Sequence, residues 1–273
     1  MSTSERHVMP SHFDTLLVDR HGPGLVVVTL NRPERLNAMT DAMFVELDCA
    51  FRELDHDDDL RVVILTGSGS AFCSGYDLSQ ADDLASIGAL AMLKKQEAAA
   101  EALLAVRTLR VPVIAAIDGP AVGGGLSLSL ACDIRLASPR ASFGAAFVRI
   151  GLSAGDLGVS WLLTRLIGPA HASEICFTGR LVDASEAVRL GLVNRVSDSV
   201  IPDAIALAEQ IMVHSPGGVQ LSKRALQANL EISSYAAALE LENRGQALLT
   251  RTTDMVEALA ATREHRPAVF WGA

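Results

Sequence analysis

The stretch GPAVGGGLSLSLACDIRLAS, residues 119–138, places three consecutive glycines ahead of a short apolar segment. It follows the run PVIAAI at residues 112–117, whose apolar and β-branched content is typical of a buried strand. We therefore expect a strand, a glycine turn, a short helix, and then a strand at DIRLAS, residues 133–138. This succession predicts an α/β fold with largely parallel strands.

The first half of the chain repeats the same alternation. The runs LVVVTL (25–30) and RVVILTG (61–67) predict strands. Between them, TDAMFVELDCAFREL (40–54) has apolar residues at helical spacing, with Thr40 or Asp41 available as its cap. A long Ala-rich helix is expected at about 86–109. From Leu157 onward the pattern is mostly helical.

Composition narrows the classes of protein to which the chain can belong. Its 273 residues are 49% hydrophobic and 20% charged, which predicts one main globular domain. A net charge of −9 argues against nucleic acid or an anionic membrane as partner. The polar segment 1–13 has no apolar core typical of a signal peptide, so we expect a flexible leader and a cytoplasmic protein.

Cysteine and histidine are too scattered to predict a metal site or a disulfide framework. The four cysteines lie far apart inside apolar stretches. The seven histidines show no pair at the spacing of metal ligands. We expect free thiols and no metal.

Two glycine-containing loops follow predicted buried strands. TGSGSAFCSGYDLS (66–79) follows one, and GPAVGGGLS (119–127) leads from the next into a helix. Glycine lets the backbone approach a ligand closely, and N–H groups at a helix N-terminus attract negative charge. Two such loops could direct two N–H donors at one oxygen and form an oxyanion hole. Ordinary turns are the alternative for both glycine segments.

Several collinear motifs resemble those of the crotonase, or enoyl-CoA hydratase/isomerase, superfamily. They are NRPERLNAMT (31–40), GSGSAFCSGYDLS (67–79), DGPAVGGGLSLSLACDIRLAS (118–138), ASFGAAFVRIGL (141–152), LTRLIGPAHASEICFTGRLVDASEAVRLGLVNRV (163–196) and HRPAVF (265–270). The resemblance implies an α/β spiral of ββα units over 14–200 and a helical C-terminal trimerisation region over 201–273. It further implies an acyl-CoA thioester as substrate, no cofactor besides the coenzyme A of that substrate, and a homotrimer or dimer of trimers.

The resemblance also implies which residues form the site. The oxyanion donors would be the backbone N–H groups of Tyr76 and Gly124. The other positions implied to contact acyl-CoA are Arg35, Leu36, Ser74, Asp77, Leu78, Gly123, Ser127, Phe147 and Phe270. Among these, Arg35 and Leu36 border the nucleotide, and Ser74, Asp77 and Leu78 border adenine and pantetheine. Phe270 matches an aromatic residue that reaches a neighbouring subunit's ligand in some relatives.

The sequence departs from the hydratase pattern at the two positions where typical hydratases carry catalytic glutamates. These positions hold Ser127 and Phe147, neither of which can act as a general acid or base near neutral pH. Asp156 aligns, with a loop one residue longer, with an aspartate used by dienoyl-CoA isomerases and a dehalogenase branch. It is therefore a candidate acid/base, and the alternative is that it only caps a helix starting at Leu157.

Other carboxylates have structural interpretations. We expect Asp133 to be structural, Asp77 to hold backbone, and Glu97 and Glu101 to lie on a solvated helix face. Two alternatives to an enzyme of the hydratase/isomerase type remain. One is an acyl-CoA-binding protein with little or no turnover, and the other is a serine hydrolase that uses Ser127.

Overall fold

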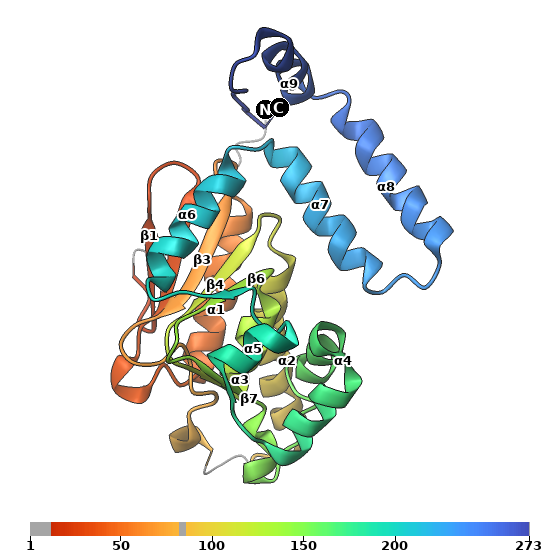
Figure 1. Cartoon of the computed structure of the whole chain (residues 1–273). Helices are drawn as coiled ribbons and strands as arrows, with labels where there is room; N and C mark the ends of the chain where they lie inside the picture. Colours follow the sequence, from red (N-terminus) through yellow and green to blue (C-terminus); the bar gives the residue numbers. More distant parts are fainter. Residues whose placement is uncertain (1–11, 82–85, 273) are drawn as a thin grey trace.

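The computed structural model describes residues 12–81 and 86–272 (Figure 1). Most of the predicted leader 1–13, and the segment 82–85 ahead of the Ala-rich helix, lie outside the described residues. The described part of the chain folds into an α/β core and an arm of three helices that extends from it.

A six-stranded sheet forms the centre of the core, with strand order β1-β2-β3-β4-β6-β9. Its strands are β1 (Leu16–Arg20), β2 (Leu25–Leu30), β3 (Val62–Gly67), β4 (Val113–Ile117), β6 (Ile134–Ala137) and β9 (Arg195–Val196). Only β1 pairs antiparallel to its neighbour, and the other four pairings are parallel. The prediction of largely parallel strands is confirmed.

Helices cover both faces of this sheet. One face is buried under α1 (Asp41–Asp55) and α2 (Ala89–Thr108), and the opposite face under α6 (Val200–Met212). Alternation along β3 divides its residues between the two faces, with Val63 and Leu65 in one hydrophobic cluster and Val62 and Ile64 in the other. With both faces covered, the strands read as continuous apolar runs in the sequence.

A second, three-stranded sheet lies beside the first. It consists of β5 (Pro120–Val122), β7 (Ser142–Gly144) and β8 (Val182–Asp183). The chain passes from β4 of the large sheet to β5 of the small one, then into α3 (Gly124–Ala131), and from β6 it passes to β7. This is the expected spiral of ββα units. The strand β5 was not predicted, because the sequence indicates only a glycine turn in this segment.

The segment after β7 carries the remaining core helices. They are the 3-10 turn η3 (Ala146–Ile150), α4 (Val159–Thr178) and α5 (Ala184–Leu190); shorter 3-10 turns occur at η1 (Pro33–Arg35) and η2 (Leu78–Gln80). A kink divides α4 at Gly168, which has φ 77° and precedes Pro169. At the start of α1, the Thr40 hydroxyl accepts a hydrogen bond from the Met43 N–H at 3.2 Å. Of the two predicted caps, Thr40 and Asp41, the structure therefore has Thr40.

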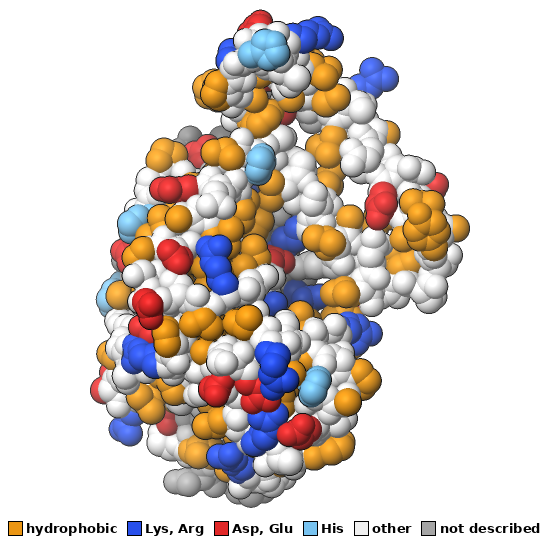
Figure 2. All heavy atoms as spheres, viewed as in Figure 1, with side chains coloured by type: hydrophobic (Ala, Val, Ile, Leu, Met, Phe, Trp, Pro, Cys, Tyr) orange, Lys and Arg blue, Asp and Glu red, His pale blue; other side chains and the backbone are white. Residues whose placement is uncertain are grey.

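The arm comprises α7 (Pro216–Asn229), α8 (Tyr235–Leu249) and α9 (Thr253–Glu264), and it extends away from the sheets (Figure 1). No residue of α8 is buried. Hydrophobic side chains lie open on the surface of the arm (Figure 2). Although the predicted helical region begins at residue 201, α6 packs on the core sheet, so the projecting part begins only with α7.

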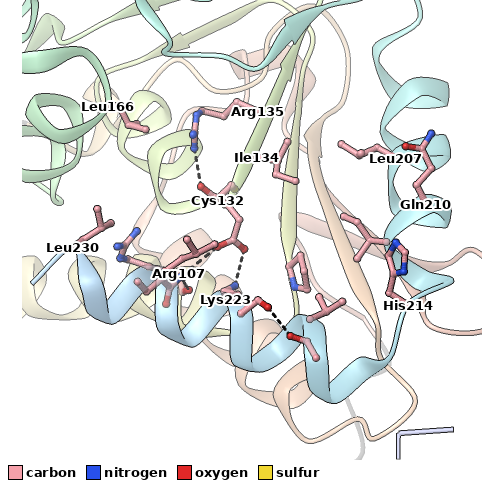
Figure 3. Close-up of a pocket in the computed structure, with 18 of the residues that line it drawn as sticks. Arg107, Cys132, Ile134, Arg135, Leu166, Leu207, Gln210, His214, Lys223 and Leu230 are labelled. Atoms are coloured by element: carbon pink, nitrogen blue, oxygen red, sulfur yellow. Dashed lines mark hydrogen bonds and ion pairs between the residues drawn. The ribbon is translucent and has the colours of Figure 1, made fainter. Parts of the chain in front are cut away.

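A cavity of about 980 Å³ separates α7 from the core (Figure 3). Lys223 crosses it, pairing with Asp133 at 2.7 Å and donating to the Val111 carbonyl at 2.9 Å. Asp133 also accepts from the Val113 N–H at 2.8 Å, which confirms its structural role. These contacts anchor α7 to the N-terminal ends of β4 and β6. None of the helices in the described residues is long and apolar enough to span a membrane.

Candidate active site

The loop after β3 and the segment after β4 lie side by side. The Cys73 N–H donates to the Pro120 carbonyl at 3.0 Å, and the Val122 N–H donates to the Cys73 carbonyl at 3.0 Å. The same loop also pairs with Met39, whose N–H donates to the Gly75 carbonyl at 2.7 Å. Backbone hydrogen bonds thus fix the relative position of the two segments.

Tyr76 and Gly124 bring their amide N–H groups to this junction. A Cβ on Gly124 would lie 3.8 Å from the Tyr76 nitrogen, and a Cβ on Gly75 would lie 3.4 Å from the Gly124 nitrogen. Within the described part of the chain, neither amide donates a hydrogen bond to the protein. Because Gly124 opens α3, its N–H has no partner inside the helix. Two unpaired donors are therefore neighbours at a helix N-terminus, an arrangement able to bind a negatively charged oxygen.

Each of the three consecutive glycines meets a different requirement. Gly123 has φ 55° and ψ −122°, a conformation that side chains strongly disfavour. A Cβ on Gly124 would lie 3.2 Å from Met39 Sδ and beside the Tyr76 nitrogen. A Cβ on Gly125 would lie 2.1 Å from the Cys73 carbonyl oxygen, a distance that no structure tolerates. Gly123 is thus required by its backbone conformation, Gly124 by access to the amides, and Gly125 by the close packing of α3.

A cavity of about 470 Å³ adjoins the two amides. Its apolar lining residues are Phe44, Leu78, Ala81, Met92, Ala99, Val122, Ala146, Phe147, Ile150, Leu152 and Leu157. Polar side chains enter it at a few places only, from Asp41, Ser74, Tyr76, Lys95, Gln96, Arg149 and Asp156. A mainly apolar cavity with a few convergent polar groups is typical of a site for a small organic ligand.

Asp156 is half-buried in the wall of this cavity. Burial raises the pKa of its carboxyl group, and hydrogen bonding by the Leu157 N–H and the Gln96 side chain offsets part of that rise. A carboxyl group whose pKa lies above its ordinary value is closer to the working range of a general acid or base.

The alternative interpretation, that Asp156 only caps the following helix, is not supported by the structure. The helix α4 starts at Val159, two residues later than expected, with Gly158 at the N-cap and no side chain accepting from its first turn. Leu157 and Gly158 both have positive φ, 45° and 81°. These two left-handed residues turn the chain between Asp156 and α4. The Asp156 carboxylate therefore lies in the cavity wall and not at the first turn of the helix.

The structure brings several of the predicted site residues together. Tyr76, Gly124 and Asp156 line one cavity, as do Ser74, Leu78, Gly123 and Phe147. Leu36 is exposed beside it, and its carbonyl accepts from the Ser74 N–H at 3.0 Å. Arg35 ends the exposed turn η1 immediately before Leu36.

Besides Arg35 and Leu36, three predicted residues lie outside the cavity lining. Asp77 is buried, pairs with Arg32 at 2.8 Å and accepts from the Ser79 hydroxyl at 2.7 Å, so its carboxylate holds the loop. The Ser127 side chain is fully buried within α3, and its Oγ donates to the Gly123 carbonyl at 3.3 Å. Phe270 lies in the tail after α9, the last helix of the arm (Figure 1), and is not among the residues that line the cavity.

Sequence reasoning missed the contribution of α2. Met92, Lys95, Gln96 and Ala99 recur at helical spacing and form one stripe of α2 that lines the cavity. The i, i+3, i+4, i+7 spacing of these residues could have indicated a common face of the helix, but the many alanines around them made the pattern hard to recognise. Glu97, predicted to be solvated, is exposed on another face of the helix, as is Glu101.

The cysteines offer no nucleophile to the site. All four are free thiols, as expected. Burial raises the pKa of both Cys73 and Cys132 to about 12, so each stays a protonated thiol near neutral pH. Within residues 12–81 and 86–272, no group of three or more His, Cys, Asp or Glu side chains is arranged to hold a metal ion.

Comparison with known proteins agrees with this fold. The family model for enoyl-CoA hydratase/isomerase matches residues 20–273. The chain belongs to the enoyl-CoA hydratase/isomerase family. A probable enoyl-CoA hydratase of Mycobacterium tuberculosis is 42% identical over 262 residues, which are 93% of this chain and 92% of that protein.

Solved structures of similar enoyl-CoA hydratases share the whole fold. A probable enoyl-CoA hydratase/isomerase from Mycobacterium abscessus is 42% identical, with a TM-score of 0.86 over 94% of this chain and 99% of that one. An enoyl-CoA hydratase from Bacillus anthracis is 34% identical, with a TM-score of 0.89 over 95% and 100%. The crotonase-type spiral with its helical C-terminal region is therefore the fold of this enoyl-CoA hydratase/isomerase family member.

Proposed function

We propose that this protein is an acyl-CoA-processing enzyme that stabilises a thioester enolate between the N–H groups of Tyr76 and Gly124. The observation that supports this most directly is that Tyr76 and Gly124, whose amides donate to no described protein group, line a mainly apolar cavity together with Asp156. Hydrogen bonds to a developing oxyanion lower the barrier by several kcal/mol without any ionisable group. The proposed reaction draws on no metal and on no cofactor besides the coenzyme A of the substrate.

Asp156 is the proposed proton-transfer group. With Ser127 buried inside α3 and Phe147 on the cavity wall, neither expected glutamate position supplies a carboxylate. A single carboxylate can remove a proton from one carbon and return it to another, which is sufficient to move a double bond. Addition of water also requires a group that activates the water. We therefore favour double-bond isomerisation, or hydration of a particular substrate, over rapid hydration of crotonyl-CoA.

Replacing Asp156 by Asn tests this role directly. Asn keeps the shape of the side chain and cannot take up a proton, so we expect kcat to fall by about a hundredfold or more. The assay uses a panel of enoyl-, dienoyl- and aryl-CoA thioesters, with substrate consumption followed by absorbance. Asp198→Asn, at an exposed carboxylate after β9, is the matched control. Unchanged turnover in Asp156→Asn would remove Asp156 from the mechanism.

Loss of both glutamates favours one alternative, an acyl-CoA-binding protein without turnover. It predicts binding of CoA thioesters by calorimetry and no product from any member of the panel. The serine hydrolase alternative is not supported, because the Ser127 hydroxyl is buried and donates to its own helix. Insensitivity to a fluorophosphonate probe is the expected result.

We further propose that the chain assembles as a homotrimer or a dimer of trimers in the cytoplasm. The arm supports this proposal, because α8 has no buried residue in the single chain and exposes large apolar side chains. In such an assembly Phe270, which lies on the arm, could approach a neighbouring subunit's acyl-CoA. Arg35 and Leu36 would border the nucleotide of the subunit's own substrate.

A further inference from the structure

The side chain of Gln96 on α2 contacts the proposed proton-transfer residue. Gln96 and Asp156 line the same cavity, and the Gln96 amide donates a hydrogen bond to the Asp156 carboxylate. A second hydrogen bond to this carboxylate comes from the backbone N–H of Leu157, the next residue along the chain. Of these two donors, only Gln96 belongs to a distant segment, so it connects Asp156 to another wall of the cavity.

Asp156 itself lies in the irregular segment between η3 and α4, where Leu157 has a left-handed backbone with φ 45°. In contrast, α2 is a regular helix that packs on α1 and α3, and Ala99, one turn after Gln96, is buried. A functional side chain is held more precisely when its partner lies on a packed element than when it depends on a loop alone. The hydrogen bond from Gln96 thus fixes the Asp156 carboxyl group relative to the cavity.

A glutamine amide suits a carboxyl group that changes its protonation state. The amide nitrogen donates to an ionised carboxylate, and the amide oxygen accepts from the hydroxyl of a protonated one. The Leu157 N–H can only donate. Within residues 12–81 and 86–272, no other hydrogen bond holds the Gln96 amide, so the amide can turn. Gln96 can therefore keep its hydrogen bond to Asp156 before and after a proton is transferred.

Charged groups on the cavity wall do not replace this hydrogen bond. The other titratable side chains of the wall come from α1, α2, the loop after β3 and η3, and they are Asp41, Lys95, Tyr76 and Arg149. Asp41 and Lys95 pair with each other. Burial raises the pKa of Asp156, and the hydrogen bonds from Leu157 and Gln96 lower it. The balance between its two protonation states thus depends on hydrogen bonding.

We propose that Gln96 is a positioning residue, which holds the Asp156 carboxyl group in the cavity in both of its protonation states. Asp156 takes a proton from one carbon of the acyl chain and returns it to another, and the Gln96 amide changes from donor to acceptor and back. This inference rests on the proposed function, because it takes Asp156 to transfer the proton. Gln96 lies outside every motif by which the chain resembles its family.

Infrared difference spectroscopy of Gln96→Met across pH tests the contact. Methionine is similar in length, favours a helix and has no hydrogen-bond donor. The carboxylic acid band that is missing in Asp156→Asn belongs to Asp156, and its amplitude against pH gives the pKa. In Gln96→Met we expect this pKa to rise by about 0.5–1 unit, because the ionised form loses a donor. The band should also move to higher frequency, because the protonated form loses an acceptor.

The pH dependence of kcat tests the role in the reaction. The substrate is the thioester of the panel that the wild type converts fastest. In Gln96→Met the acidic limb of the profile should move to higher pH by the same amount as the pKa. The plateau kcat should fall by about tenfold, because the carboxyl group is held less precisely. KM should change much less, because Gln96 acts on Asp156 and not on the thioester.

The control is Glu97→Gln, at the next residue of α2, which is exposed. Removal of its negative charge could only lower the pKa of Asp156, the opposite direction. This variant should keep the wild-type band and profile.

An Asp156 band and pKa that stay the same in Gln96→Met would overturn the inference. So would a shifted pKa together with a wild-type kcat profile. In both cases loss of turnover in Asp156→Asn still supports the proposed function. Full turnover in Asp156→Asn, or a wild type that converts no thioester, would overturn both proposals.

Discussion

At the scale of single residues, Asp156 combines two properties that a purely structural residue does not need. It faces an apolar cavity, and burial raises its pKa. In the unfolded chain its pKa returns to the ordinary value of about 3.9. The folded state therefore binds the proton more tightly, and folding is disfavoured by this group once it is ionised.

This sign gives a stability prediction for Asp156→Asn. As pH rises from the ordinary pKa of aspartate through the raised folded pKa, the wild type should lose stability that the variant keeps. Above that window the variant should be the more stable protein, and below it the two should be similar apart from a constant offset. Thermal unfolding across this pH range measures the effect. A variant whose stability falls with pH in parallel with the wild type would contradict the pKa direction.

Gly124 and Gly125 allow access and packing to be separated by matched substitutions. In Gly124→Ala the new methyl meets the flexible Met39 side chain and lies in front of the Tyr76 amide. We expect stability to change little and turnover to fall by about a hundredfold. In Gly125→Ala the methyl would collide with the Cys73 carbonyl oxygen.

The expected cost of Gly125→Ala is about 3 kcal/mol or more of folding free energy, which chemical denaturation measures. If instead Gly124→Ala were fully active, the site of the proposed oxyanion contact would have to lie elsewhere.

At the scale of elements, the sequence predicts well those segments whose pattern is long enough to repeat. The strand β2 spans the predicted residues, and α1 buries Met43, Leu47, Ala50 and Leu54 along one stripe as expected. The strands β5, β7 and β8 have only two or three residues each, too few for a period to appear. Their pairing depends on where distant segments meet, which local sequence does not encode.

The candidate site was predictable to the extent that backbone motifs define it. Gly75, Tyr76, Gly123 and Gly124 lie in motifs with distinctive spacing, and all four line the cavity. The polar stripe of α2 carries no such motif, because Lys95 and Gln96 look like ordinary solvated residues in an Ala-rich helix. Only the packing of α2 beside α1 turns them toward the site.

The attachment of α7 gives a prediction at the same scale. Lys223 is buried, and burial lowers its pKa despite the pairing with Asp133. Lys223→Met would remove the cation that pairs with the Asp133 carboxylate and would leave the Val111 carbonyl without this donor, at a cost of about 2 kcal/mol. We expect faster hydrogen exchange throughout α7, measured by mass spectrometry, and a lower Tm. Lys94→Met, at an exposed lysine of α2, should alter neither.

At the scale of the whole molecule, the arm carries apolar surface that a single chain leaves open. Leu248 and Val256 are 67% and 68% exposed on α8 and α9. Contiguous apolar surface of this kind usually marks a protein interface. Where α7 begins, the arm is tied internally, since Asp254 of α9 accepts from the Ser215 hydroxyl and the Trp271 N–H, each at 2.8 Å.

We therefore expect sedimentation equilibrium to give the mass of a trimer or a hexamer. The double variant Leu248→Asp/Val256→Asp should shift the distribution to the monomer, because assembly would bury two unpaired charges per chain. Val45→Asp, at an apolar residue of α1 that is 64% exposed, should keep the wild-type mass. A wild-type protein that sediments as a monomer would rule out the proposed assembly.

The position of the arm after the core in the chain also has a consequence for biosynthesis. The large sheet is complete at β9, and α6 already covers its second face before α7 begins. Because N-terminal units fold first during translation, the core can form while the arm is still inside the ribosome. The apolar surface of α8 and α9 then emerges last, beside a finished core. In the proposed assembly, exposure of that surface in the cell is thereby limited to the interval between release of the chain and its association with other copies.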